Sequence, residues 1–348
     1  MATVRETTYD LLRALDLTTV FGNPGSTEEP FLQDFPGDFR YVHALHEASA
    51  VAMADGYAQA TGRPAHVNLH TAPGTGNGMG NLVTAWHNKT PLIVTAGQQT
   101  RQMLLIEPRL ANPRAAELTQ PYVKWSYEPA RAQDIPAAFM RAYATAVQPP
   151  AGPVFLSLPL DDWDQPAAGA PVVRTVATRY APDPQRLREF ADAVAASRSP
   201  ALVLGSAVDR AGAWPAAVAL AERLAAPVWS APAPERAAFP EDHRHFRGVL
   251  PYAIGPLAEA LRGHDTVLVV GAPSSGTTRT CRGTTCPPAP GCCTSPTIRA
   301  RPPARRSGTA CSATPAWPWP PWPTSCRRPT ARHHRPGPPR RRPTAARR

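Results

Sequence analysis

Residues 41–97 constrain the fold more than any other stretch, because strand-like and helix-like runs alternate there with short connections. One strand-like run ends at Glu47, where an alanine-rich helical pattern begins. A second ends at His70, before a glycine-rich stretch, a further helix and a third strand. Such alternation predicts a doubly wound parallel sheet and therefore an α/β fold. Both polar residues stand at predicted strand ends, where open α/β sheets bind ligands.

Alternating strands and helices continue along most of the chain and predict a second α/β domain. A stretch rich in Pro and Ala separates the two patterns and is typical of a linker. No further element follows the predicted strand at 266–271, which indicates that the second domain is incomplete. In chain order we expect a first domain at 1–164, a linker at 165–183, a truncated second domain at 184–273 and a tail at 274–348.

The tail has a composition of its own. Its 75 residues contain 15 Arg, 16 Pro, all six Cys of the chain and no Asp, Glu or Lys. The formal net charge of +11 therefore belongs to the tail, and residues 1–273 carry −4. A Pro-rich segment without acidic partners predicts disorder, and arginines without interleaved stacking aromatics predict no specific nucleic-acid partner. A zinc site in the tail is a weak alternative, because its cysteines match no common C-x-x-C spacing. The residues available for such a site are Cys281, Cys286, Cys292, Cys293, His333 and His334.

Nothing in residues 1–273 indicates secretion or membrane insertion. That part contains no cysteine for a disulfide scaffold, and its first eight residues lack the apolar run of a secretory signal. No stretch is long and apolar enough to span a bilayer. We expect a cytoplasmic protein without a membrane partner.

The glycine-rich stretch 71–80 is expected to be a turn whose backbone N–H groups approach a ligand. Its spacing, G-x-G-x-G-x-G, differs from the dinucleotide fingerprint G-x-G-x-x-G, and no ribose-binding acid follows at a suitable distance. His70 beside this stretch could transfer protons, although a core histidine is the commoner interpretation. Glu47 could equally be a helix-dipole partner in the first turn of its helix.

A second turn, at 23–26, follows a short strand near the amino terminus. Its Asn-Pro-Gly-Ser sequence forces the chain to change direction. Ser26 or Thr27 is expected to cap the following helix, with Glu28 and Glu29 in its first turn, where acidic residues are favourable.

Six segments, in this order, resemble the thiamine-diphosphate-dependent decarboxylases. They are VFGNPGSTE, ALHEASAVAMADGYA, NLHTAPGTGNGMG, LIVTAGQQTR, VKWSYEPA and DDWD. The likeness extends from about residue 3 to Pro273. It implies three consecutive α/β domains, which are a pyrimidine-binding domain, a central domain and a domain that holds diphosphate through Mg²⁺. Only the first is expected to be complete here.

The resemblance implies thiamine diphosphate as cofactor and a small 2-oxo acid, aromatic by overall likeness, as the substrate that loses CO2. Glu47 matches the glutamate that hydrogen-bonds the cofactor's aminopyrimidine ring, His70 a proton-transfer residue and Ser26 a residue that orients the substrate carboxylate. In this family the cofactor lies between two subunits, which implies a homodimer or a homotetramer. Five residues match the walls of the pyrimidine pocket: Asn23, Pro24, Gly25, Gly74 and Asn77.

The family's Mg²⁺ site, a G-D-G segment followed by an Asn, is absent from the sequence. If the tail is translated back into GC-rich codons and read one base earlier, parts of it resemble family sequence. We therefore expect that a frameshift near codon 274 produced the tail and removed the third domain. This chain alone is then expected to be inactive. The alternatives are a non-catalytic α/β fragment and a relative that acts on another 2-oxo acid, such as an acetolactate synthase or an oxalyl-CoA decarboxylase.

Overall fold

The computed structural model describes residues 1–272 and 292–294, and the rest of the expected tail lies outside the described residues. The strands form two sheets, one of six strands and one of five. Every strand pairing in both sheets is parallel. The predicted parallel α/β class is therefore confirmed, but the second sheet includes β11, which lies beyond the expected end of the second domain at residue 273.

The first sheet has the strand order β2-β1-β3-β4-β6-β5. Its central strands β3, β4 and β6 are buried along their whole length, as expected for parallel strands covered on both faces. The strands are β1 (Thr19–Gly22), β2 (Arg40–His43), β3 (Ala65–Leu69), β4 (Leu92–Gln98), β5 (Ser126–Tyr127) and β6 (Val154–Pro159).

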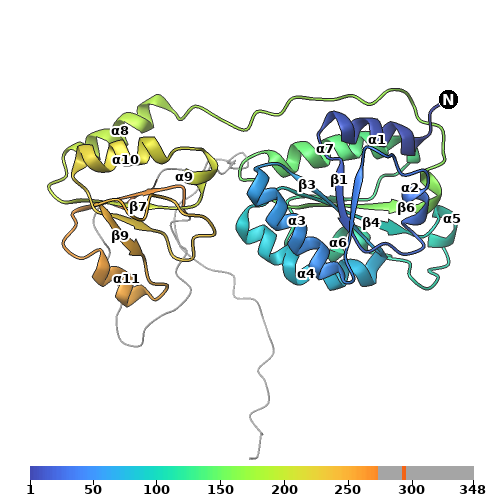
Figure 1. The fold of residues 1–348 in the computed structure, drawn as a ribbon, viewed down its shortest axis with the longest axis horizontal. Helices are drawn as coiled ribbons and strands as arrows, with labels where there is room; N and C mark the ends of the chain where they lie inside the picture. Colours follow the sequence, from blue (N-terminus) through green and yellow to red (C-terminus); the bar gives the residue numbers. More distant parts are fainter. Residues whose placement is uncertain (273–291, 295–348) are drawn as a thin grey trace, which may run out of the picture. The chain divides into compact units, whose positions relative to one another are not determined.

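Helices cover both faces of this sheet (Figure 1). On one face, α1 (Val4–Ala14) and α7 (Ile135–Val147) enclose an aromatic and aliphatic core that includes Tyr9 and Phe139. On the other, α3 (Glu47–Thr61) and α4 (Thr71–Asn88) pack on a core of small and β-branched residues. The shorter elements are α2 (Glu29–Leu32), α5 (Arg101–Leu104), α6 (Ala115–Leu118) and the 3-10 turns η1 (Ala132–Asp134) and η2 (Leu160–Asp162).

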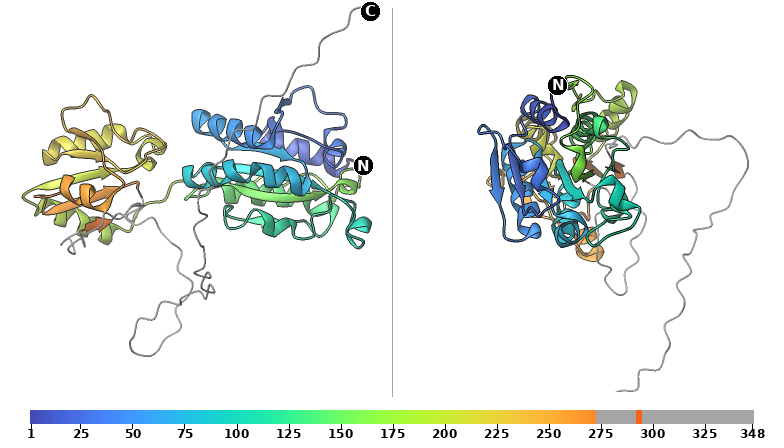
Figure 2. Two further views of the ribbon diagram at one scale, coloured as in Figure 1. Left: turned by 90° about the horizontal axis from the view of Figure 1, so that it is seen from below. Right: turned by 90° about the vertical axis from the view of Figure 1, so that its right-hand side faces the viewer.

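Local sequence explains where α1 begins. Thr3 accepts a hydrogen bond from the backbone N–H of Glu6, and the Glu6 carboxylate accepts one in return from Thr3, which together form a capping box. The amino terminus lies beside the segment that follows η2 (Figure 2). Thr3 and Pro166 form an isolated antiparallel β-bridge, and the Val4 N–H donates to the Gln165 carbonyl at 2.9 Å.

The glycine-rich stretch is not a turn, so that prediction was wrong. Residues 71–80 form the first half of α4. Pro73 is tolerated because it lies in the first helical turn, where backbone N–H groups have no intrahelical partner. Gly74 and Gly78 face α3, and a Cβ at Gly78 would lie 3.2 Å from Val51 Cγ2. Close packing of the two helices therefore outweighs the low helix propensity of glycine.

Gly76 lies on the exposed side of α4, where a Cβ would meet no atom within 4 Å. We expect Gly76→Ala to raise the free energy of unfolding by about 0.5–1 kcal/mol, because alanine loses less backbone entropy in a helix. Gly78→Ala is the matched control and should give no such gain, since its methyl group would press on Val51. Urea unfolding followed by tryptophan fluorescence measures both. Equal effects of the two substitutions would contradict this account of α4.

The second sheet has the order β11-β10-β7-β8-β9. Helices α9 and α10 cover one core of it, around Leu202 and Phe239, and α11 contributes to another around Val203. β11 lies within the segment for which disorder was expected. The elements are α8 (Pro184–Ala195), β7 (Pro200–Leu204), α9 (Ala207–Arg210), α10 (Trp214–Leu224), β8 (Val228–Ser230), β9 (Phe246–Val249), α11 (Ile254–Ala260), β10 (Thr266–Val270) and β11 (Cys292–Thr294).

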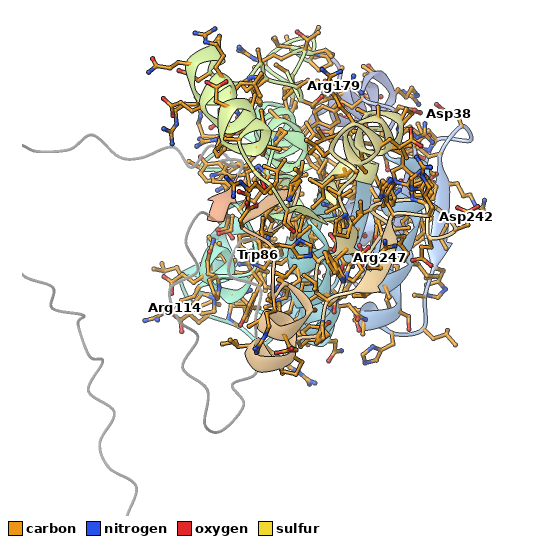
Figure 3. All side chains as sticks on the ribbon, turned by 90° about the vertical axis from the view of Figure 1, so that its left-hand side faces the viewer. Asp38, Trp86, Arg114, Arg179, Asp242 and Arg247 are labelled. Atoms are coloured by element: carbon orange, nitrogen blue, oxygen red, sulfur yellow. The ribbon has the colours of Figure 1, made fainter. Side chains whose placement is uncertain are left out.

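The described surfaces of both domains carry charged side chains. Asp38, Arg114, Asp242 and Arg247 are exposed and project outward (Figure 3). Among the described residues, no helix is long and apolar enough to cross a membrane.

Candidate functional site

The candidate site lies at the carboxyl edge of the first sheet, where four neighbouring strands end. Asn23 follows β1, Glu47 opens the helix after β2, His70 follows β3, and Gly97 and Gln98 close β4. Because the strands are parallel, these ends meet at one edge. The chain order reverses between β1 and β3, and ligands bind at such a switch point in open α/β sheets.

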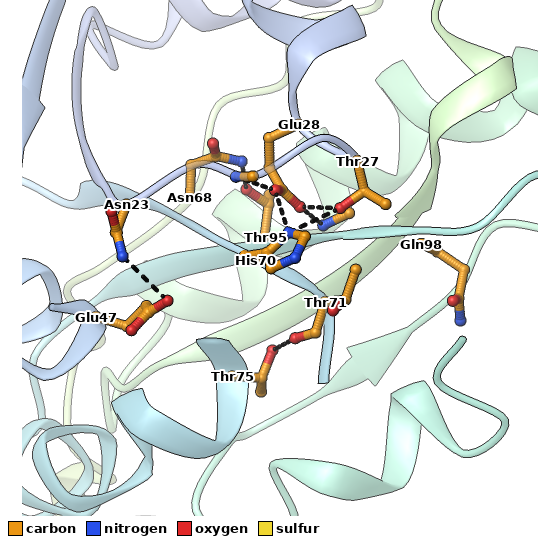
Figure 4. A network of polar contacts seen from close by, with 12 residues as sticks. Asn23, Thr27, Glu28, Glu47, Asn68, His70, Thr71, Thr75, Thr95 and Gln98 are labelled. Carbon is orange, nitrogen blue, oxygen red and sulfur yellow. Dashed lines mark hydrogen bonds and ion pairs between the residues drawn. The ribbon is translucent and has the colours of Figure 1, made fainter. Parts of the chain in front are cut away.

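Glu47 is 6% exposed and is held by two amide side chains. Asn23 Nδ2 donates to its Oε1 atom at 3.3 Å (Figure 4). Asn77 Nδ2 donates to its Oε2 atom at 3.0 Å. The sequence predicted all three residues for one pocket, and the structure brings them together. Burial raises the pKa of Glu47, but the hydrogen bonds from Asn77, its own backbone and Asn23 outweigh burial and lower it below the ordinary value.

His70, which is partly buried, pairs with the buried Glu28. Its Nδ1 atom lies 2.9 Å from Glu28 Oε2 and 3.2 Å from Thr27 Oγ1. The hydrogen bond to Glu28 raises the pKa of His70, burial opposes that effect, and the charges of Glu28 and Glu47 add to it. The His70 imidazole therefore carries a proton over a wider pH range than an ordinary histidine.

Glu28 is the site residue that the sequence interpretation missed. It was assigned to the first turn of a helix, but its side chain is 1% exposed and points into the sheet edge. Its carboxylate accepts hydrogen bonds from the backbone N–H groups of Gly25 at 2.8 Å and Gly97 at 2.7 Å. Gly97 is 69 residues away in the chain, so no local pattern distinguishes Glu28 from the exposed Glu29.

The expected cap of α2 is also absent. The helix begins after Glu28, whose side chain makes no cap hydrogen bond, and the Thr27 hydroxyl donates to the Glu28 carboxylate instead. Ser26 is exposed beside Gly25, and its hydroxyl makes no hydrogen bond to another described residue. The network around the buried carboxylate takes the place of a helix cap here.

Three glycines provide the space for these side chains. A Cβ at Gly25 would lie 2.3 Å from His70 Nδ1, and a Cβ at Gly97 would lie 2.2 Å from Glu28 Oε1. At Gly74 it would lie 3.0 Å from Glu47 Oε1. Real Cβ atoms essentially never come closer than 3.0 Å to another heavy atom. Glycine is thus required at 25 and 97 because of close approach, and neither residue has a positive φ angle.

We expect Glu28→Gln to lower the pKa of His70. In this variant His70 loses its charged hydrogen-bond partner, while the burial of its ring, which lowers the pKa, remains. A raised pKa means that protonated His70 stabilises the folded state. This contribution is fully present below the ordinary histidine pKa of about 6.5 and disappears as the pH rises through the folded value. The stability gap between wild type and variant should therefore narrow as the pH rises from about 6.5 through the raised pKa of His70 in the folded state.

Two measurements check this prediction. Titration of the histidine ring signals by NMR reports the pKa of His70 directly, and urea unfolding across the pH range reports the stability gap. Glu29→Gln changes the adjacent, exposed carboxylate and is the matched control, which should leave both unchanged. An unaltered His70 titration in Glu28→Gln would show that the ion pair does not form in solution.

Comparison with known families assigns both domains. Residues 2–116 match the thiamine pyrophosphate enzyme family's N-terminal TPP binding domain, and residues 187–290 match the central domain of the same family. The chain belongs to the thiamine pyrophosphate enzymes. The central-domain match continues beyond Pro273, where the likeness was expected to stop.

The most informative relatives are decarboxylases of aromatic 2-oxo acids. Benzoylformate decarboxylase of Pseudomonas aeruginosa is 55% identical over 276 residues, which cover 78% of this chain and 52% of that protein. The crystal structure of benzoylformate decarboxylase from Polynucleobacter necessarius aligns with a TM-score of 0.81 at 56% identity, covering 83% of this chain and 55% of that one.

A third relative is named for a related activity. The thiamine diphosphate-dependent 4-hydroxybenzoylformate decarboxylase of Rhodococcus jostii RHA1 aligns with a TM-score of 0.80 at 46% identity, over 83% of this chain and 55% of that one. The chain thus spans about half the length of the relatives it matches.

Proposed function

We propose that this chain supplies the pyrimidine-binding half of the active site of a thiamine-diphosphate-dependent carboxy-lyase, which converts benzoylformate and a proton to benzaldehyde and CO2. The observation that carries the proposal is the buried Glu47 carboxylate, held between two amides at a sheet edge shared with His70. The names of three relatives support an aromatic 2-oxo acid as the substrate.

The residues at this edge fit an aminopyrimidine ring. Each oxygen of Glu47 accepts one amide hydrogen and retains a lone pair for a ring nitrogen. Gly74 keeps the backbone beside Glu47 clear of a side chain. Asn23, Pro24, Gly25 and Asn77 would complete the walls of the pocket. When bound, thiamine diphosphate supplies the electron sink that takes up the electron pair left as CO2 departs.

Each catalytic candidate has a distinct task in this proposal. Glu47, whose lowered pKa keeps it ionised, accepts a hydrogen bond from a protonated nitrogen of the pyrimidine ring. His70 is bound to Glu28 through Nδ1, so its Nε2 atom exchanges a proton with the carbonyl oxygen of the substrate. The exposed Ser26 hydroxyl orients the substrate carboxylate by a hydrogen bond.

Mg²⁺ and the diphosphate would be held by residues other than those described. Among the described residues, no group of three or more His, Cys, Asp or Glu is placed to bind a metal ion. We propose that in a homodimer or homotetramer of the intact enzyme, which would include the third domain, the diphosphate site of one subunit faces Glu47 of another. A frameshift near codon 274 remains our explanation for the tail, and resequencing of the gene tests it.

The experiment compares two proteins. One is the 348-residue chain, and the other is a fused enzyme in which residues 1–272 are joined to the part of the Pseudomonas aeruginosa relative that follows the matched region. With thiamine diphosphate, Mg²⁺ and benzoylformate, we expect benzaldehyde from the fused enzyme and none from the chain alone. Turnover by the chain alone would refute the half-site proposal. A fused enzyme that converts pyruvate but not benzoylformate would refute the aromatic specificity.

A further inference from the structure

The residue that follows His70 is unusual in three respects. Thr71, the first residue of α4, has a φ of +34°, which β-branched residues rarely adopt. Its side chain is wholly buried, and its hydroxyl has no hydrogen-bond partner within the described part of the chain. A backbone outlier and an unpaired buried hydroxyl both destabilise a fold. Glycine would avoid both effects.

The chain is fixed on both sides of Thr71. Before it, β3 pairs with β1 as far as Asn68 and with β4 as far as Leu69. After it, α4 packs on α3, the Gly74 N–H donates to the His70 carbonyl at 2.7 Å, and the Thr75 hydroxyl donates to the Thr71 carbonyl at 2.6 Å (Figure 4). The change of direction from strand to helix therefore falls on His70 and Thr71.

This change of direction between β3 and α4 also sets the position of the His70 ring. The ring lies against Gly25 so closely that a Cβ there would be 2.3 Å from Nδ1, and it meets Glu28 at 2.9 Å. Since strand and helix are both anchored, a change in φ at Thr71 would be taken up by His70 and would alter this contact. A buried branched side chain at position 71 restricts such changes, whereas glycine would permit them.

We propose that Thr71 is a positioning residue, whose buried β-branched side chain keeps the His70 imidazole against Glu28. The proposal rests on the proton-transfer function proposed above for His70. It explains why a residue that is unfavourable in conformation and in hydrogen bonding occupies this position. The branched carbon skeleton provides the restraint, and the hydroxyl does not contribute to it.

The test uses the complete 348-residue chain without cofactor, so its outcome is independent of catalytic activity. NMR titration of the histidine rings is recorded for wild type, Thr71→Gly and Thr71→Val, together with urea unfolding. We expect Thr71→Gly to lower the midpoint of the His70 titration, because the ring leaves Glu28. Thr71→Val keeps the branched shape and removes the unpaired hydroxyl, so it should preserve the titration and raise the unfolding midpoint.

Asp16→Gly is the matched control. Asp16 also has a positive φ, +58°, but it precedes β1 at the opposite edge of the same sheet, so the His70 titration should not change. If Thr71→Gly fails to fold, Thr71→Ala is measured in the same way, with a smaller shift in the same direction expected. An unchanged His70 titration in the folded glycine or alanine variant overturns the proposal. An equal shift in Thr71→Val overturns it as well, since the hydroxyl would then be responsible.

Discussion

Replacing Glu47 by glutamine is expected to reduce the kcat of the fused enzyme by about 10²–10⁴-fold, the range typical of losing a general acid or base. The carboxylate is buried, and its oxygens are oriented by Asn23 and Asn77. Glutamine has nearly the same shape but cannot hold or release a proton at its oxygen. It also turns an NH2 group toward one of the two amide donors, so the pocket loses its charge and one of its hydrogen bonds.

The measurement is steady-state decarboxylation of benzoylformate by the fused enzyme and its variant. Glu29→Gln is the matched control, because Glu29 is exposed and leaves the site intact. Unfolding curves of both variants show whether the domain remains folded. A folded Glu47→Gln variant with a wild-type rate would remove Glu47 from the mechanism, whatever happens to the substrate specificity.

Much of this fold could be predicted from the alternation of apolar runs. The parallel class and the strand end before His70 follow from that pattern, because buried parallel strands produce short continuous apolar runs. The strand expected to run up to Glu47 ends earlier, at His43, and is not fully buried. Asn23 and Asn77 could be placed in one pocket only through the resemblance to a family. They are 54 residues apart, and both contact Glu47 through their side chains.

The errors have a common physical cause. Residues 71–80 are rich in glycine, which favours a turn in an isolated chain, yet two of these glycines allow α4 to pack closely on α3. Glu28 was assigned to a helix terminus, but its partners Gly97 and His70 reach it only after the sheet has formed. In both cases a tertiary contact decides the local structure, and such contacts leave no periodic signal in the sequence.

Gly97→Ala is expected to lower the free energy of unfolding of the first domain by about 3 kcal/mol, the upper end of the range for overpacking a core. The added Cβ would lie 2.2 Å from Glu28 Oε1 and 2.6 Å from Thr27 Oγ1. Glu28 is 1% exposed and accepts hydrogen bonds from two backbone N–H groups, so its carboxylate cannot move aside without leaving buried donors unpaired. Strand β4 is buried along its length and cannot shift either.

Gly152→Ala separates this steric effect from the general cost of replacing a buried glycine. Gly152 is also buried and has no positive φ, but its added Cβ would meet only the aliphatic part of the Lys124 side chain, at 3.2 Å. A flexible side chain can yield by a few tenths of an ångström, so this control should change stability little. Urea unfolding measures both variants, and NMR titration should show that Gly97→Ala also displaces His70 from Glu28. If both variants are equally stable, the Glu28 carboxylate must have room to move, and the pair it forms with His70 cannot be the rigid element on which the proposed proton transfer depends.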